Sequence, residues 1–259
     1  TIQNAAIIAQ DLCDEFGRDC VEHLSTALTP EDRNTVIERV KLRLKNEKDT
    51  NWTLVATSCV EAGVDFSFRT GFRELSSLLS LLQAAGRVNR HGRFSNAEMW
   101  SFSLEDNAML TKNLALDESR EVLKSYFIEN ININPELSTR SMNDEIKRND
   151  SCIIDIVSRL KEEDAMAFET VNEKFNVIDS DTVSVIVDEA LAKAVAYGQG
   201  VWQTLQRQSV SIRRSKVREW NLRECVTGIY QWTLQYDDFL GYMSGVLDLM
   251  KTKTEVLFY

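Results

Sequence analysis

The chain has 259 residues, 43% of them hydrophobic and 27% charged, so it can bury a full core and form more than one compact unit. Its formal net charge of −10 argues against a protein that coats nucleic acid through bulk positive charge. Five cysteines without a C-x-x-C pair, and the lack of both a leader pattern and an apolar run of about 18 residues, predict a soluble cytoplasmic protein with reduced thiols and no membrane partner.

The first sixty residues alternate helix and strand patterns. Residues 3–16 place apolar side chains at helical spacing, and Gly17 is positioned to end that helix. Residues 21–25 predict a short strand. A threonine cap and a proline at the first helical position predict a helix over 29–44. Residues 52–57 predict a buried strand.

A second helix and strand follow, and then a helical connector. Leucines over 75–88 predict an amphipathic helix ending near the last of these residues, and 97–102 predict a strand. Strands that alternate with helices of this length imply a parallel sheet. Residues 104–168 are helical in pattern and rich in charge, divided by a loop that holds Pro135, with a broad apolar face over 153–160.

The pattern changes again near residue 175. Val177 and Ile178, and then residues 183–187, predict strands joined by an Asp-Ser-Asp turn, which begins a small α/β unit. We therefore expect three parts, with boundaries at 1–104, 105–168 and 169–259.

Two basic segments stand out on the acidic chain. Residues 207–218 hold five cations and no acid, and three tryptophans interleave with this region: Trp202, Trp220 and Trp232. Residues 66–93 hold one acid, Glu74, and five arginines: Arg69, Arg73, Arg87, Arg90 and Arg93. Both segments suit a groove that contacts phosphates, although solvated faces have the same composition. The tryptophans fit either base stacking or the core of the small unit.

Two further segments carry candidate chemistry. Residues 54–66 form a strand that ends in hydroxyl groups and then a turn with glycine and aspartate. In the second, Gln83, Arg87 and Arg90 are spaced i, i+4 and i+7 and so would project from one helical face. A permanently charged, planar guanidinium suits the charge of a transferring phosphoryl group. Gly86 would let backbone or ligand approach that face.

These two segments resemble motifs V and VI of superfamily 2 helicases, the sixth of which has the pattern Gln-x-x-Gly-Arg-x-x-Arg. The stretches 23–28, 56–68 and 83–92 are closer still to the helicase half of the CRISPR-associated helicase-nuclease of type I systems. The stretch 239–242 is similar to that family's C-terminal domain, so the resemblance covers most of the chain. It implies an α/β fold: an N-terminally truncated RecA-like parallel sheet with flanking helices, a helical linker and a small C-terminal α/β domain.

The resemblance also implies roles toward ATP. Arg87 and Arg90 would reach its phosphates from across a cleft, with Arg90 as the arginine finger, and Gln83 would orient near the γ-phosphate. The residues expected on the nucleotide side are Gly63, Asp65 and Gly86.

Other residues are expected to contact single-stranded DNA. The resemblance places Thr57 and the Ser25-Thr26 pair at the backbone of the strand. Arg69 and Arg73, from the first basic segment, are expected at its phosphates. Contacts of this kind position the strand without reading its sequence.

Some parts of such a motor are missing from the sequence. None of the ten glycines is followed by lysine, so the phosphate-cradling loop is absent. His23 and His91 are not followed by the aspartate of a nuclease metal cluster, and no metal site is expected. Residues 185–190 mimic the acidic box that holds magnesium, but their order along the chain and ordinary helix capping favour a decoy. His91 could contact phosphate beside Arg90, although a loop histidine is more often only solvated. Cys59 is expected to serve packing.

We therefore expect the C-terminal half of an ATP-dependent single-stranded DNA translocase or helicase of CRISPR interference. Its ATP would be held with Mg²⁺ bound mainly by a first motor domain outside this chain. Expected partners are single-stranded DNA, the N-terminal helicase and nuclease domains, and a CRISPR surveillance complex. The chain opens in helical sequence, which predicts a piece of a longer protein that is inactive alone. The alternative is a non-catalytic nucleic-acid or partner-binding module derived from a helicase fold.

Overall fold

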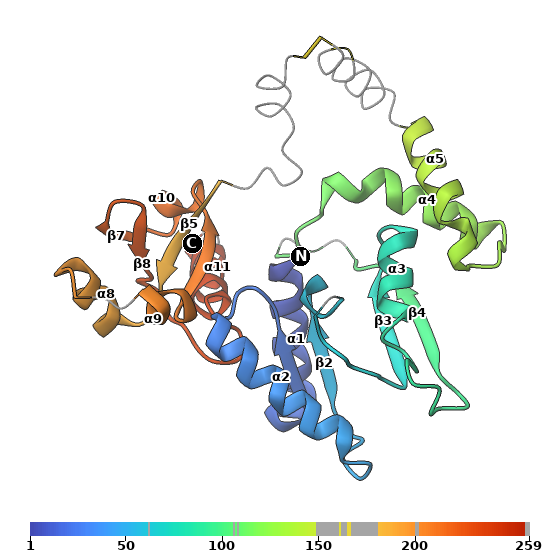
Figure 1. The fold of residues 1–259 in the computed structure, drawn as a ribbon, viewed down its shortest axis with the longest axis horizontal. Coiled ribbons are helices and arrows are strands. Elements are labelled where there is room, and N and C mark those ends of the chain that lie inside the picture. Colours follow the sequence, from blue (N-terminus) through green and yellow to red (C-terminus); the bar gives the residue numbers. More distant parts are fainter. Residues whose placement is uncertain are drawn as a thin grey trace. The chain divides into compact units, whose positions relative to one another are not determined.

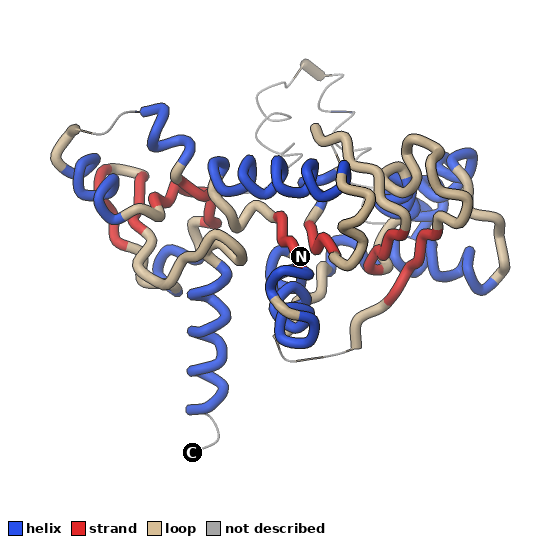
Figure 2. The backbone as a smooth tube through the Cα atoms, turned by 90° about the horizontal axis from the view of Figure 1, so that it is seen from below, coloured by secondary structure: helices blue, strands red, loops and turns tan. Residues whose placement is uncertain are grey.

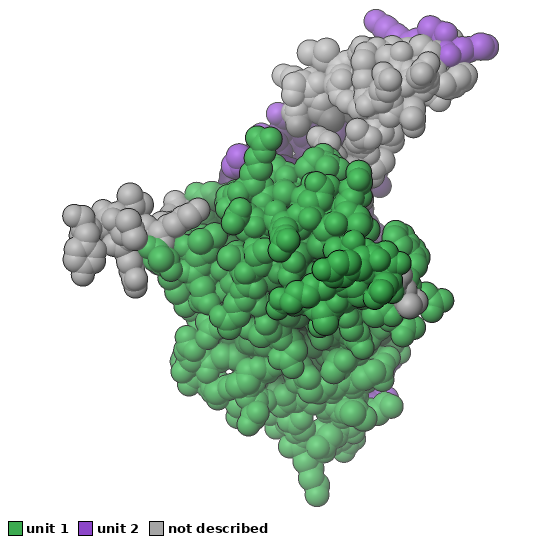
Figure 3. Space-filling model, turned by 90° about the vertical axis from the view of Figure 1, so that its left-hand side faces the viewer, with its two compact units in different colours: residues 1–66, 106–112, 180–259 green, residues 67–105, 113–179 purple. Residues whose placement is uncertain are grey.

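The structure is a computed structural model. It describes residues 1–148 except 62, 106 and 108, residues 161 and 165–166, and residues 181–256 except 200–201. The chain divides into two compact units, shown in different colours in Figure 3. Unit 1 comprises residues 1–66, 106–112 and 180–259, and unit 2 comprises residues 67–105 and 113–179. The three-part boundaries expected from the sequence stay a prediction.

Unit 1 begins with two helices and two parallel strands (Figure 1). In chain order these elements are α1 (Ile2–Phe16), β1 (Val21–Leu24), α2 (Pro30–Lys45) and β2 (Thr53–Ala56). The four elements expected over this stretch are confirmed. Gly17 ends α1 with a φ of 89°, and the Thr29 side chain accepts a hydrogen bond from the backbone of Asp32 to cap α2.

A buried carboxylate fastens α2 to β1. Glu22 is 2% exposed, and both of its oxygens accept from Arg39 Nε at 2.9 Å. Arg43 Nη1 adds a third bond at 3.2 Å. Because an unpaired charge in the interior is costly, this pairing is what allows Glu22 inside the fold.

The strand β2 is less buried than the sequence predicted. Thr53 is exposed and the next three residues are half-buried. Within unit 1, β2 pairs with β1 and packs against α1. This leaves part of its surface uncovered by the described residues of the unit, so an apolar run over-predicted its burial.

The C-terminal part of unit 1 holds a mixed four-stranded sheet in the order β6-β5-β8-β7. Its strands are β5 (Thr182–Ile186), β6 (Ser209–Arg213), β7 (Arg223–Val226) and β8 (Ile229–Gln231), and its helices are α8 (Glu189–Ala196), α9 (Trp202–Arg207), α10 (Lys216–Glu219) and α11 (Met243–Val256). Of these strands, only β5 was expected from the sequence; a helix capped by the acids after it, here α8, was also expected. The expected strand at 177–178 and its turn lie outside the described residues. Figure 2 shows α11 as the long helix that ends the described chain.

An aromatic cluster fills the core of this sheet. Trp220 meets Trp232 edge-on, with ring centroids 5.8 Å apart, and Tyr242 lies within 5.8 Å of both rings. Trp232 is 4% exposed, so the core interpretation is confirmed for these two tryptophans. Trp202 is exposed. The same buried cluster includes Ala6 of α1, so the two ends of unit 1 share one core.

The described residues of unit 2 form a parallel strand pair and three α-helices. Its elements are β3 (Thr70–Glu74), α3 (Leu78–Ala85), β4 (Glu98–Phe102), α4 (Asp117–Ile128) and α5 (Ser138–Arg148). Sequence analysis missed β3, which pairs with β4. The expected helical connector contains α4 and α5, joined by a hydrogen bond of 2.8 Å from Tyr126 to Asp144. Its apolar stretch over 153–160 lies outside the described residues.

Among the described segments, no helix combines the length and apolar character needed to span a bilayer.

Candidate functional site

The carboxyl ends of β1 and β2 bring three predicted contact residues to one edge. The two strands run parallel with Leu24 opposite Ala56, and Thr57 N–H donates to the carbonyl of Leu24 at 3.1 Å. Thr26 is exposed there, whereas Ser25 is fully buried and its hydroxyl accepts from Ala27 N–H at 3.2 Å. Of the pair, Thr26 alone faces solvent. The DNA contact expected of Ser25 stays a prediction.

Cys59 closes the turn after β2. Its thiol donates to the carbonyl of Leu24 at 3.2 Å and accepts from the Thr57 hydroxyl at 3.4 Å. Burial raises the pKa of this thiol above its ordinary value, which keeps it protonated and unreactive. The expected packing role fits this geometry.

The turn that follows presents Gly63 and Asp65. Gly63 has a φ of +79° and is exposed, with open space around its Cα. An L side chain would be strained at this φ, so glycine shapes the turn. Asp65 is also exposed, and Phe66, which is fully buried, anchors the end of the turn.

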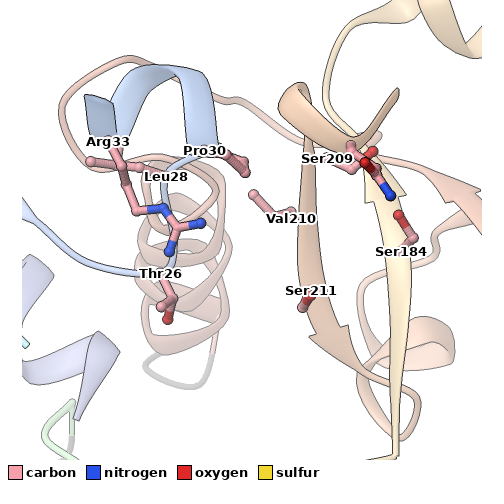
Figure 4. Close-up of a pocket in the computed structure, with 9 residues that line it drawn as sticks. Thr26, Leu28, Pro30, Arg33, Ser184, Ser209, Val210 and Ser211 are labelled. Carbon is pink, nitrogen blue, oxygen red and sulfur yellow. The ribbon is translucent and has the colours of Figure 1, made fainter. Parts of the chain in front are cut away.

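A cavity of about 300 Å³ opens beside Thr26, between the start of α2 and the strands β5 and β6. Figure 4 shows the Arg33 guanidinium directed toward Thr26 at one wall, with Ser184, Ser209 and Ser211 at the other. Sequence analysis missed Arg33. Its position in the sequence could have indicated it, because Arg33 lies near the start of a capped helix that follows the predicted DNA-contacting residues Ser25 and Thr26.

In unit 2, the arginine motif does not lie on one helical face, so that prediction was wrong. The helix α3 ends at Ala85 with Gly86 as its cap, and Gln83 alone of the three motif side chains is helical. The chain then turns to pair with Phe68, whose N–H donates to the carbonyl of Arg87 at 2.8 Å. This backbone pairing stops the helix three residues earlier than the predicted end near Val88.

Arg90 lies on a loop over 89–94, here named the arginine loop. Asn89 shapes it: its φ is +49°, and its side chain accepts from Phe94 N–H at 2.9 Å and donates to Phe94 O at 2.8 Å. Arg90 and His91 are exposed on this loop, and Arg87 is half-buried before it. Asn89 was missed in the sequence. Its tolerance of positive φ and the following Arg-His-Gly were the available signals.

Arg69 and Arg73 lie at and before β3. Arg69 is exposed, and Arg73 is half-buried on the strand. Unit 2 therefore carries Arg69, Arg73, Gln83, Gly86, Arg87 and Arg90, and unit 1 carries Ser25, Thr26, Thr57, Gly63 and Asp65.

The acidic decoy after β5 behaves as a helix cap. Asp188 accepts from Leu191 N–H at 2.6 Å, and Glu189 pairs with Lys193 at 2.7 Å. The capping interpretation is confirmed. Within the described part of the chain, no three histidine, cysteine or acidic residues gather as a metal site would require.

Parallel strand pairs with helices between them, hydroxyl and acidic turns at the strand ends and a following Gly-Arg-x-x-Arg loop define one class of fold. This mixed α/β arrangement, with parallel strand pairs and a separate mixed sheet, fits a RecA-like C-terminal portion followed by helices and a small α/β part.

Sequence comparisons match part of the chain to one family. Residues 1–93, which include both motif segments, match the family model described as CRISPR-associated nuclease/helicase Cas3, C-terminal. The Cas3 protein of Haloferax volcanii is 39% identical over 70 residues, or 27% of this chain and 7% of that protein. The family resemblance found in the sequence, to a C-terminal helicase part of Cas3, is confirmed.

Solved structures support the same fold over most of the chain. T. fusca Cas3-AMPPNP matches 93% of this chain with a TM-score of 0.60 and 14% identity, and T. fusca Cas3 matches 93% with a TM-score of 0.58 and 16% identity. A CRISPR RNA-guided surveillance complex in a pre-nicking state matches 92% with a TM-score of 0.55 and 14% identity. At these identities the likeness shows the fold alone. The chain spans 36–37% of the length of these structures.

Proposed function

We propose that this chain is the C-terminal half of an ATP-dependent single-stranded DNA translocase of CRISPR interference. The observation that carries the proposal is the arginine loop: Asn89 pins a short exposed loop that presents Arg90 directly after the helix that carries Gln83. A guanidinium held at a fixed position is suited to stabilise charge on a transferring phosphoryl group. The family match over residues 1–93 supports this assignment.

In this proposal Arg90 is the arginine finger. Arg87 is the second cation at the phosphates, and Gln83 orients near the γ-phosphate. Gly86 caps α3 in right-handed geometry, with a φ of −65°. A Cβ there would lie 3.3 Å from Gln83 O, so glycine keeps this turn tight beside the two arginines.

ATP fits this chain in part. The exposed Arg90 and the turn with Gly63 and Asp65 suit the phosphate side of a nucleotide. The sequence holds no Gly-Lys loop to cradle phosphates. A first motor domain would therefore supply that loop and most of the protein contacts to Mg²⁺. ATP would supply the phosphoryl group.

Single-stranded DNA would meet Thr26 and Thr57 at the strand ends of unit 1, and Arg69 and Arg73 in unit 2. Ser25 would act through the shape of its loop, because its hydroxyl is engaged there. Binding should be tolerant of sequence and should weaken steeply with salt. The further partners we propose are the N-terminal helicase and nuclease domains and a CRISPR surveillance complex, in the cytoplasm.

The alternative is a binding module that keeps the helicase fold without an ATPase cycle. It would explain the acidic chain and the absent phosphate loop equally well. It predicts that substitutions in the arginine loop leave the ATP turnover of the full-length protein unchanged.

The test is Arg90→Ala in the full-length protein, with Arg93→Ala on the same exposed loop as matched control. DNA-stimulated ATP turnover should fall by about 10³-fold or more with Arg90→Ala, and single-strand binding should hold. Arg90→Lys should rescue poorly, because an ammonium cannot reproduce the forked donor. Near-wild-type turnover of a folded Arg90→Ala protein would favour the binding module.

A further inference from the structure

A distant segment of unit 1 grips the loop that carries Thr26. We call residues 25–29 the contact loop and residues 235–242 the latch segment. The contact loop links β1 to α2, and the latch segment leads into α11. Three residues of the contact loop other than Thr26 and Ser25, namely Ala27, Leu28 and Thr29, are each at most 2% exposed. The loop is therefore held from behind while Thr26 faces outward.

The first contact joins the two backbones. Tyr242 N–H donates to Ala27 O at 3.1 Å. Beside it Gly241 has a φ of +64°, and a Cβ on Gly241 would lie 2.1 Å from the same carbonyl oxygen. No side chain fits at that distance, so the approach of the latch segment depends on glycine.

The second contact is made by a phenol. Tyr236 OH accepts from Thr29 N–H at 3.0 Å and donates to the carboxylate of Asp32. Thr29 caps α2, and its hydroxyl also bonds Asp32, at 2.7 Å. In a capping box the side chain three residues into the helix would take the Thr29 N–H. Here Tyr236 takes it, so one phenol ties the end of the contact loop to the start of α2.

The third contact lies just before the loop. His23, the residue before Leu24 on β1, is fully buried, and its Nδ1 bonds the carbonyl of Phe239 at 2.6 Å. The Arg18 guanidinium lies 3.8 Å from the centre of the Phe239 ring. The latch segment thus meets the chain before, within and after the contact loop.

The latch segment is also ordered by itself. The Asp237 carboxylate accepts from Phe239 N–H at 2.9 Å and from Leu240 N–H at 2.6 Å. Gly241 N–H donates to the backbone carbonyl of Asp237 at 3.0 Å. These internal bonds order the latch segment from within, so it can act as a template for the contact loop.

We propose that the latch segment sets the conformation in which the contact loop presents Thr26 to single-stranded DNA, with Tyr236 as a positioning residue. The inference rests on the proposed function, because it needs Thr26 to meet the strand. It assigns the C-terminal part of the chain a role in DNA affinity. It leaves phosphoryl transfer to the arginine loop, which belongs to unit 2.

The test is Tyr236→Phe in the full-length protein, which keeps the ring and removes the hydroxyl. Hydrogen exchange of a peptide covering 25–33 should quicken by about tenfold, because the variant loses both the bond from Thr29 N–H and the bond to the Asp32 carboxylate. The single-strand concentration that half-saturates ATP turnover should rise by about three- to tenfold. The maximal ATP turnover should equal that of the wild type, and the melting temperature should fall by only a few degrees. Tyr197→Phe, at an exposed tyrosine of the same unit, is the matched control. It should change neither the hydrogen exchange of 25–33 nor the DNA concentration that half-saturates turnover.

Thr26→Ala separates failure of the latch from failure of the proposed function. Unchanged exchange at 25–33 in Tyr236→Phe overturns the latch. A second outcome is faster exchange in Tyr236→Phe with unchanged DNA dependence of turnover, while Thr26→Ala does weaken DNA binding. That outcome shows that the latch segment does not influence DNA affinity. If Thr26→Ala leaves DNA affinity unchanged, the proposed DNA contact at this loop is wrong, and the latch's role in affinity is wrong with it.

Discussion

The contact loop of unit 1 and the arginine loop of unit 2 are both short loops that present a predicted functional side chain, yet different parts of the chain fix them. The contact loop is held by a segment more than 200 residues away, as the bond between His23 and Phe239 at a separation of 216 residues illustrates. The arginine loop is held by Asn89, whose bonds span five residues. The first loop is a product of tertiary structure and the second of local sequence.

This difference predicts how each loop fails. The contact loop should respond to changes anywhere in the core that joins β1, α2 and the latch segment, because its geometry exists only when they are packed. The arginine loop should respond to Asn89 and its immediate neighbours. Positioning by the fold and positioning by a single side chain can thus be separated by mutation.

The largest expected effect is on the stability of the Glu22 network, which fastens α2 to β1 on either side of the contact loop. Glu22→Gln removes a buried charge that pairs with the half-buried guanidinium groups of Arg39 and Arg43. We expect it to lower the free energy of unfolding by about 3 kcal/mol, because breaking a buried pair leaves its partners uncompensated. Urea denaturation followed by tryptophan fluorescence measures this loss.

Its matched control is Glu38→Gln on α2, the helix that carries Arg39 and Arg43. Glu38 pairs with Lys41 at the surface, and an exposed pair contributes about 0–1 kcal/mol. Equal losses for the two variants would show that the Glu22 network does not anchor α2.

A smaller and more local effect is expected for Asn89→Ala. Alanine is strained at a φ of +49° and cannot bond Phe94, at a cost of about 1–2 kcal/mol. ATP turnover of the full-length protein should fall by about tenfold, since one such cost converts to that factor, with DNA affinity retained. Asn89→Gly tolerates the positive φ but also loses the bonds to Phe94, so its ATP turnover should lie between those of the wild type and Asn89→Ala.

Asn130→Ala is the control for backbone strain alone. Asn130 also has a positive φ, of 54°, and follows α4 in unit 2. This variant should lose only the stability that the backbone strain costs, without loss of ATP turnover. If both variants lower turnover equally, the arginine loop has no special dependence on Asn89.

The sequence predicted those elements that carry their own signals. The cap at Thr29, the proline after it and the glycine after α1 located two helices to within a residue or two. Short strands without an apolar run were missed. The strand β3, with the sequence Thr-Gly-Phe-Arg-Glu, forms because β4 pairs with it, and its residues alone favour no strand.

The same distinction holds for the candidate site. Residue types and their order along the chain were enough to find the motif segments. Their geometry was not, because the spacing of Gln83, Arg87 and Arg90 fits a helix that Phe68 terminates through backbone bonds. The contacts of the latch segment join positions too far apart for any local pattern to reveal.

The smallest expected effect concerns His23, and it tests whether the tertiary contacts of the contact loop give unit 1 a pH dependence. The partner of Nδ1 is a carbonyl, which can only accept, so Nδ1 carries the proton and Nε2 is the bare nitrogen of a neutral ring. Nε2 is buried without a hydrogen-bond partner. Burial lowers the pKa of His23 from its ordinary value of about 6.5, while the Phe239 carbonyl and Asp237 raise it and Arg18 lowers it further.

A lowered pKa in the folded state means that the unfolded chain binds the proton first. The stability linked to His23 is therefore fully present above about pH 6.5 and is lost as the pH falls toward the folded value. His23→Asn keeps a donor at the position of Nδ1 and cannot titrate. Its free energy of unfolding should be lower at pH 7.5, because the smaller side chain leaves space, but should fall less than wild type between pH 7.5 and pH 5. His91→Asn, at the exposed histidine of unit 2, should keep the wild-type difference. A His23→Asn protein with the full wild-type loss would place the pH dependence elsewhere and remove His23 from the account of the contact loop.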